Sequence, residues 1–81
     1  MDNNRIREKV LEAMCEINEE VMENQDKDLL LHGVIDSFDI VGIMVELEDA
    51  FGVEIDAEKV TPDHFRTVDA IVALMEETIN Q

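Results

Sequence analysis

Hydrophobic residues recur at helical spacing along most of the chain. In the first segment they stand three and four residues apart, with charged residues on the rest of the circumference: Ile6, Val10, Ala13, Met14, Ile17 and Val21. This spacing predicts an amphipathic helix over about residues 3–22. A polar stretch then breaks the pattern, and the leucine-rich segment after it is too short and irregular for a long helix. Residues 23–35 are therefore expected to form a long connection, pinned to the core by its leucines, with Gly33 as a turn.

The second helix has clear boundary signals at both ends. Asp36 or Ser37 should open it, because Asp39 completes an arrangement like a capping box, with Asp in place of the usual Glu. The helix should run to Phe51, where Gly52 supplies a C-terminal stop.

The remaining sequence predicts a loop and further helices. Residues 53–55 alternate like a strand without a visible partner, so we expect an extended loop, followed by a helical turn at about 56–60. Pro62 suits the first position of another helix, and Thr67 can cap the last one. The apolar positions of that last helix are Val68, Ile71, Val72, Leu74, Met75 and Ile79. The pattern predicts a small all-α bundle, with residues 1–81 as a single domain.

The second helix carries more apolar residues than one buried stripe requires. At about 100° per residue, one sector holds Ile40, Ile43, Met44, Leu47 and Phe51. The apolar arc continues on the side of Ser37 through Phe38, Val41 and Val45. Glu48 lies in this extension, and a carboxylate there is hard to bury. The extension is therefore expected to face solvent. We define the valine strip as Val41 and Val45 together with Glu48 and Asp49 at their edge. This mixture of apolar and acidic residues is typical of a docking surface. The alternative is an ordinary core helix with a solvated acidic back, in which Ser37 serves only as a cap.

Charge narrows the class of partner. The chain has 21 acidic and 6 basic residues in 81, a net charge of −15. Such a polyanion is repelled by nucleic-acid phosphates and by anionic membranes, so basic protein surfaces are the expected partners. Residues 28–58 hold nine acids and no Lys or Arg. Acidity is thus concentrated around the second helix.

Other counts favour an intracellular protein. Cys15 is the only cysteine, so no intrachain disulfide can form. The start of the chain lacks the pattern of a signal peptide, and no apolar run approaches the roughly 18–20 residues that span a membrane. We expect a cytoplasmic monomer without stable membrane insertion.

Two segments carry a family resemblance. Residues 33–41 hold an Asp-Ser-Phe motif, and residues 46–55 hold a Leu-Glu-Asp run followed by Phe51. Together they resemble the acyl carrier protein family, whose hallmark is Asp-Ser-Leu at the start of the second helix. The resemblance extends over nearly the whole chain in length, charge and helix order, including residues 67–71. It implies a four-helix bundle with three longer helices, one short helix and a long loop between the first two.

The resemblance also implies a function without catalysis. A phosphopantetheine arm from coenzyme A would be esterified to the Oγ of Ser37 by a transferase that uses magnesium, and Asp36 would help to organise that metal. The arm's thiol would hold acyl groups as thioesters for fatty-acid, polyketide or related synthases and acyltransferases. The second helix would dock on basic patches of these partners and of a loading ligase through Phe38, Asp39, Val41, Val45, Glu48 and Asp49.

Two departures point to a specialised carrier. Phe38 replaces the usual Leu, a change familiar among D-alanyl carrier proteins, and Gly42 stands where many fatty-acid carriers have an acidic docking residue. An aminoacyl or D-alanyl carrier, loaded by a stand-alone adenylating ligase, is therefore an alternative. A rival of another class is an acidic adaptor that carries nothing.

Other chemistries fit poorly. A serine hydrolase would pair Ser37 with His32 or His64, but the small-residue context of a nucleophile elbow is missing. A calcium loop starting at Asp26 lacks the required glycine. No catalytic residue and no resident metal are expected, and Cys15 is expected to be a structural or semi-exposed thiol.

Overall fold

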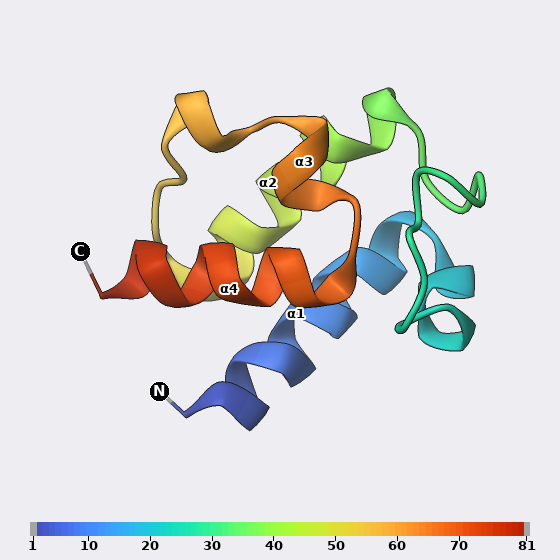
Figure 1. The fold of residues 1–81 in the computed structure, drawn as a ribbon. Helices are drawn as coiled ribbons and strands as arrows, with labels where there is room; N and C mark the ends of the chain where they lie inside the picture. Colours follow the sequence, from blue (N-terminus) through green and yellow to red (C-terminus); the bar gives the residue numbers. More distant parts are fainter. Residues whose placement is uncertain (1, 81) are drawn as a thin grey trace.

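Residues 2–80, which the computed structural model describes, form helices and loops without a strand. The elements are α1 (Asn3–Ile17), η1 (Glu19–Glu23), α2 (Ser37–Phe51), η2 (Ala57–Lys59), α3 (Pro62–Phe65) and α4 (Val68–Ile79). In Figure 1, α1 packs against α2 and α4, and the short α3 bridges α4 and α2. The predicted bundle of three longer helices and one short helix is confirmed.

Aliphatic side chains fill the centre of the bundle. The buried set is Ile6, Val10, Ala13, Met14, Val21, Leu29, Val34, Ile35, Ile40, Ile43, Leu47, Ile55, Phe65, Val68, Ile71, Val72, Leu74 and Met75. No polar or charged residue between 2 and 80 is buried. The fold therefore rests on apolar burial, at about 25 cal/mol per Å² of apolar surface, and the charge lies on the outside.

The first helix is shorter than its apolar pattern predicts. It ends at Ile17, because Asn18 takes an extended conformation (φ −155°, ψ 113°) and starts the 3₁₀ helix η1. The Asn18 side chain accepts a hydrogen bond from Glu20 N at 2.9 Å and donates one to the Val34 carbonyl at 2.7 Å. The prediction of one helix over 3–22 was wrong. The apolar periodicity continues past Ile17, but Asn18 breaks the helix and hydrogen-bonds to Val34, which is distant in the sequence.

The predicted boundaries of α2 and the predicted start of α4 are confirmed. Asp36 caps α2, and Gly52 ends it in the left-handed region, at φ 64° and ψ 33°, where glycine is favoured. Thr67 caps α4 by accepting a hydrogen bond from Ala70 N at 3.0 Å. Pro62 opens α3 as expected.

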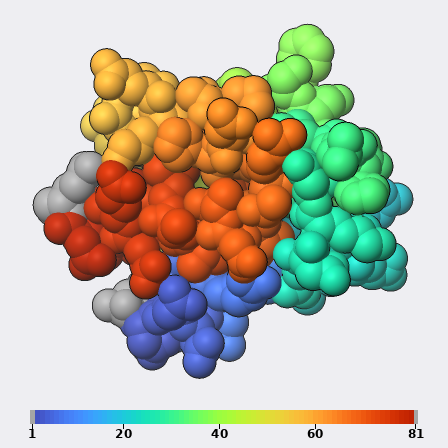
Figure 2. Space-filling model, viewed as in Figure 1, coloured from blue at the N-terminus to red at the C-terminus, as the bar shows by residue number. Residues whose placement is uncertain are grey.

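The connection before α2 wraps one end of the bundle, as the green and teal segment of Figures 1 and 2 shows. Leu29 is its buried anchor: its N–H donates to the Arg66 carbonyl at 2.6 Å, and its own carbonyl accepts from Val34 and Ile35. Leu31, by contrast, is 75% exposed. The leucine anchor of this connection is thus mainly Leu29, placed just upstream of Asp36.

Candidate attachment site and docking surface

Ser37 is the first residue of α2, and it is exposed. The residue before it is locked by a reciprocal capping box. Oδ1 of Asp36 accepts hydrogen bonds from Phe38 N (2.9 Å) and Asp39 N (3.1 Å), while Oδ2 of Asp39 accepts from Asp36 N (3.0 Å). The hydroxyl therefore stands on a fixed first turn and remains open to a partner.

The position of Ser37 suits a phosphate ester. The N-terminus of a helix carries about half a positive charge and presents backbone N–H groups, so it stabilises a negatively charged phosphodiester. Residues 2–80 contain no cluster of three or more His, Cys, Asp or Glu that could hold a metal ion. A serine hydroxyl of this kind fits the acceptor of a group delivered by another protein.

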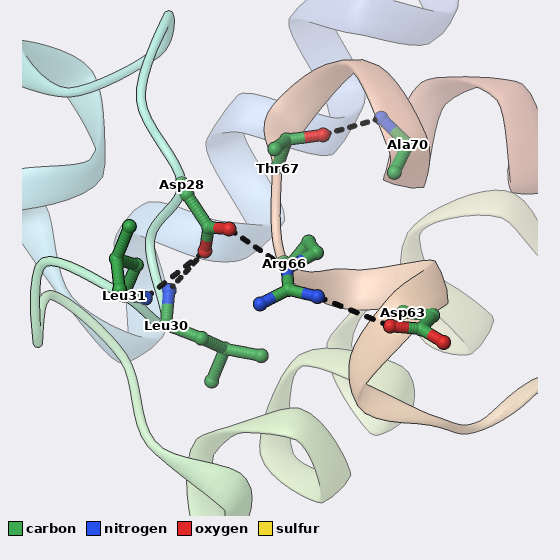
Figure 3. Close-up of polar contacts among 7 residues, drawn as sticks. All are labelled: Asp28, Leu30, Leu31, Asp63, Arg66, Thr67 and Ala70. Atoms are coloured by element: carbon green, nitrogen blue, oxygen red, sulfur yellow. Dashed lines mark hydrogen bonds and ion pairs between the residues drawn. The ribbon is translucent and has the colours of Figure 1, made fainter.

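A polar cluster ties the connection upstream of Ser37 to the end of α3, as Figure 3 shows. Oδ1 of Asp28 accepts hydrogen bonds from the N–H groups of Leu30 (3.1 Å) and Leu31 (3.0 Å). Its Oδ2 accepts one from Arg66 Nε at 2.8 Å, and Arg66 also pairs with Asp63 at 3.1 Å. The Leu31 N–H and the charge of Arg66 hold the pKa of Asp28 below its usual range. This cluster fixes the turn that leads into α2, and sequence inspection missed it.

The predicted exposure of the side of α2 that follows Ser37 is confirmed for its apolar residues. Phe38 is 88% exposed, Val41 56% and Val45 49%, and Asp49 is also exposed. Large apolar side chains left in water on one helix face are typical of an interaction surface. The valine strip therefore continues from Ser37 along α2.

Two carboxylates assigned to this surface also hold the fold. Glu48 is half-buried, and its Oε2 accepts a hydrogen bond from Ile55 N at 2.9 Å. Asp39 is half-buried within the capping box. Glu48 is not buried, as expected, but the sequence did not indicate its second contact, in which the loop after α2 folds back onto its carboxylate. Asp49 remains the exposed acid at the edge of the valine strip.

Comparison with known proteins assigns the family. The family described as "Phosphopantetheine attachment site" matches residues 4–75. The chain is a phosphopantetheine-binding carrier domain. A D-alanyl carrier protein from Staphylococcus saprophyticus is 34% identical to this carrier domain over 73 residues, which cover 88% of this chain and 94% of the relative. No solved structure matches the carrier domain significantly. Its prosthetic group is covalently attached phosphopantetheine.

The other residues considered from the sequence lie apart from this chemistry. His32 is an exposed loop residue, and Nδ1 of His64 lies 2.8 Å from Oγ1 of Thr61. Asp28, in the rejected calcium loop, is occupied by Arg66 and backbone N–H groups. No helix of the described part is long and apolar enough to cross a bilayer.

Proposed function

We propose that Ser37 carries the phosphopantetheine arm and that the cargo is an amino acid of the D-alanyl class. The supporting observation is the exposed hydroxyl of Ser37 on the capped first turn of α2. The similarity to a D-alanyl carrier protein and the Phe38 that follows the serine favour an aminoacyl cargo over a fatty acyl chain. Loading would then require a stand-alone adenylating ligase.

Two transfers make up this function. In the first, the Ser37 oxygen attacks the phosphorus of coenzyme A that bears the pantetheine; an O–P bond forms, the pyrophosphate bond breaks, and adenosine 3′,5′-bisphosphate leaves. The serine proton passes to a base of the transferase. In the second, the arm's thiol displaces AMP from an aminoacyl adenylate made with ATP and becomes a thioester. The carrier domain's own residues orient the serine and stabilise the new phosphodiester at the helix N-terminus.

Intact-protein mass spectrometry tests the attachment. The carrier domain is incubated with coenzyme A, magnesium and a broad-specificity phosphopantetheinyl transferase. We expect one phosphopantetheine per chain in the parent protein and none in Ser37→Ala. If no mass is added to the parent, the carrier function is contradicted and the acidic-adaptor function is favoured. If Ser37→Ala gains the same mass as the parent, the arm is attached at another residue.

The cargo is tested on the loaded protein. With ATP and a D-alanine-activating ligase, we expect the mass of one alanyl group, removable by hydroxylamine as a thioester is. A fatty acid with its own activating ligase serves as the comparison. Preferential fatty acylation would favour a fatty-acid or polyketide carrier, the second candidate, and would leave the attachment at Ser37 intact.

The valine strip is the proposed contact of the transferase and the ligase. Because Glu48 also holds Ile55, its replacement would mix docking with loop stability. Asp49→Lys is the cleaner probe, and Glu54→Lys is a matched control, since both residues are exposed acids. We expect Asp49→Lys to slow loading by the transferase and Glu54→Lys to leave it nearly unchanged. Equal rates for both variants at low salt would argue against this contact.

A further inference from the structure

A second surface lies on the outside of α1, away from the valine strip. It is an open groove of about 380 Å³ lined by Glu8, Leu11, Glu12, Cys15 and Met22. This volume falls within the range of about 300–1,000 Å³ found for small-ligand sites. The lining residues of α1 stand on the face opposite its buried positions, and Met22 reaches the groove from η1, where it is 51% exposed. The groove is thus a feature of the surface, and Leu11 in its lining also packs against the core.

Two acidic residues, Glu8 and Glu12, line the groove, and Glu16 follows one turn further along α1. Glu8, Glu12 and Glu16 follow one another at i, i+4 spacing, where like charges destabilise a helix. The last turn of α1 contains no basic residue to match the negative end of the helix dipole. None of the ion pairs formed within residues 2–80 involves these three glutamates. These carboxylates are therefore free to pair with the cations of a partner protein.

The floor of the groove is uncharged. Burial and the nearby Glu19 carboxylate raise the pKa of the Cys15 thiol, Glu16 adds to the rise, and a backbone hydrogen bond from Met22 opposes it. The thiol therefore stays protonated at neutral pH, beside the apolar Leu11 and Met22. A ligand would meet the apolar side chains of Leu11 and Met22 beside the carboxylates of Glu8 and Glu12.

We propose that the α1–η1 groove docks a basic amphipathic helix of a partner protein. An apolar side chain of that helix would enter the groove, and flanking Lys or Arg residues would pair with Glu8, Glu12 and Glu16. The net charge of −15 disfavours a second copy of this chain as the occupant, because like-charged surfaces repel. Anionic lipid is disfavoured on the same ground.

This surface leaves α2 free. The opposite face of α1 packs against α2 and α4, so a partner seated on the groove would not cover the side of α2 that follows Ser37. A protein could hold the carrier domain there while the attached cargo is presented to another. The proposal concerns a different face from the attachment site and stands independently of the cargo.

The test is a titration of isotope-labelled apo protein, followed by NMR, at about 0.15 M salt. The probe is a synthetic helical peptide with leucines at i, i+3 and i+4 between flanking lysines; a second peptide has glutamines in place of the leucines. We expect saturable shifts confined to residues 8–22 with the leucine peptide alone. Met22→Gln, a half-exposed position whose change spares the core, and the pair Glu8→Lys with Glu12→Lys should each weaken binding about tenfold.

A matched charge change separates docking from general attraction. Glu54→Lys with Glu58→Lys alters the net charge equally at exposed positions away from α1, and it should change the affinity by less than about twofold. Equal weakening by this pair, or equal binding of the glutamine peptide, would reduce the effect to charge attraction and overturn the proposal. Shifts on the valine strip, or shifts that grow with protein concentration without peptide, would also overturn it.

Discussion

Gly42, a residue that helix propensity disfavours, lies where the neighbouring helix α1 comes close to α2. A glycine within a helix costs about 1 kcal/mol relative to alanine. In the sequence it looks like a missing acid in a docking surface. In the structure, a Cβ added at Gly42 would lie 3.0 Å from Cδ1 of Ile17, at the crossing of α1 and α2. Any side chain there, acidic or not, requires the terminal methyl of Ile17 to shift by a few tenths of an ångström.

This contact predicts a coupling between two substitutions. Gly42→Ala gains helix propensity but must push Cδ1 of Ile17 aside, whereas Ile17→Val removes that carbon. We therefore expect Gly42→Ala to be more stabilising in the Ile17→Val background than alone, by about 0.5–1 kcal/mol. Urea unfolding of the four proteins measures this difference. A coupling of less than about 0.3 kcal/mol would mean that Ile17 relaxes freely and that the crossing does not require glycine.

Asp28 predicts a pH dependence at a single residue. Its pKa is lowered in the folded state by backbone N–H groups and by Arg66, so the stability it contributes is complete above its ordinary pKa of about 3.9. That contribution is lost as the pH falls through the lower, folded value. Asp28→Asn, which resembles the protonated acid, should be less stable than the parent at neutral pH, and the two melting temperatures should converge as the pH falls through the lowered, folded-state pKa of Asp28. Asp63→Asn is the control, since Asp63 shares Arg66 but is highly exposed. A gap that stays constant with pH would exclude the ionised carboxylate as the cause.

At the scale of elements, helix boundaries set by neighbouring residues could be predicted from the sequence, whereas a boundary set by a contact distant in the sequence could not. The ends of α2 follow from residues within three positions of each boundary: Asp36 with Asp39, and Gly52. The break after Ile17 was missed because one of the two side-chain hydrogen bonds of Asn18 goes to Val34, sixteen residues away. Periodicity alone carries a helix through such a residue, since the apolar spacing continues in η1.

The same division applies to the candidate site. The exposure of Ser37, Val41 and Val45 could be predicted from their angular positions on one helix. The engagement of Glu48 could not, because it depends on the loop that returns to α2 through Ile55. Likewise, Asp28 and Arg66 are 38 residues apart, and only the wrapped connection brings them together. The angular position of a residue predicts which side of a helix is exposed to solvent. Tertiary contacts decide which carboxylates on that side are hydrogen-bonded within the fold.

At the scale of the whole molecule, charge opposes folding. Fifteen net negative charges share a body of about 31 × 25 × 18 Å. The Debye length is about 30 Å at 0.01 M salt and about 10 Å at 0.1 M, so repulsion spans the entire molecule only in the more dilute buffer. The ion pairs from Arg7, Lys59 and Arg66 are weakened by the same salt, but acids outnumber bases by 21 to 6. Repulsion is the larger effect.

Added sodium chloride should therefore raise the melting temperature, with most of the rise below about 0.2 M, where screening changes fastest. Replacing Glu54 and Glu58 by glutamine removes two exposed acids and should flatten this rise. Loading by a basic transferase should respond in the opposite direction, because the same screening slows charge-steered association. A melting temperature that increases only at molar salt would point to salting-out of apolar surface instead. If added salt raises the melting temperature and slows loading over the same range, the net negative charge both destabilises the fold and accelerates association with basic partners.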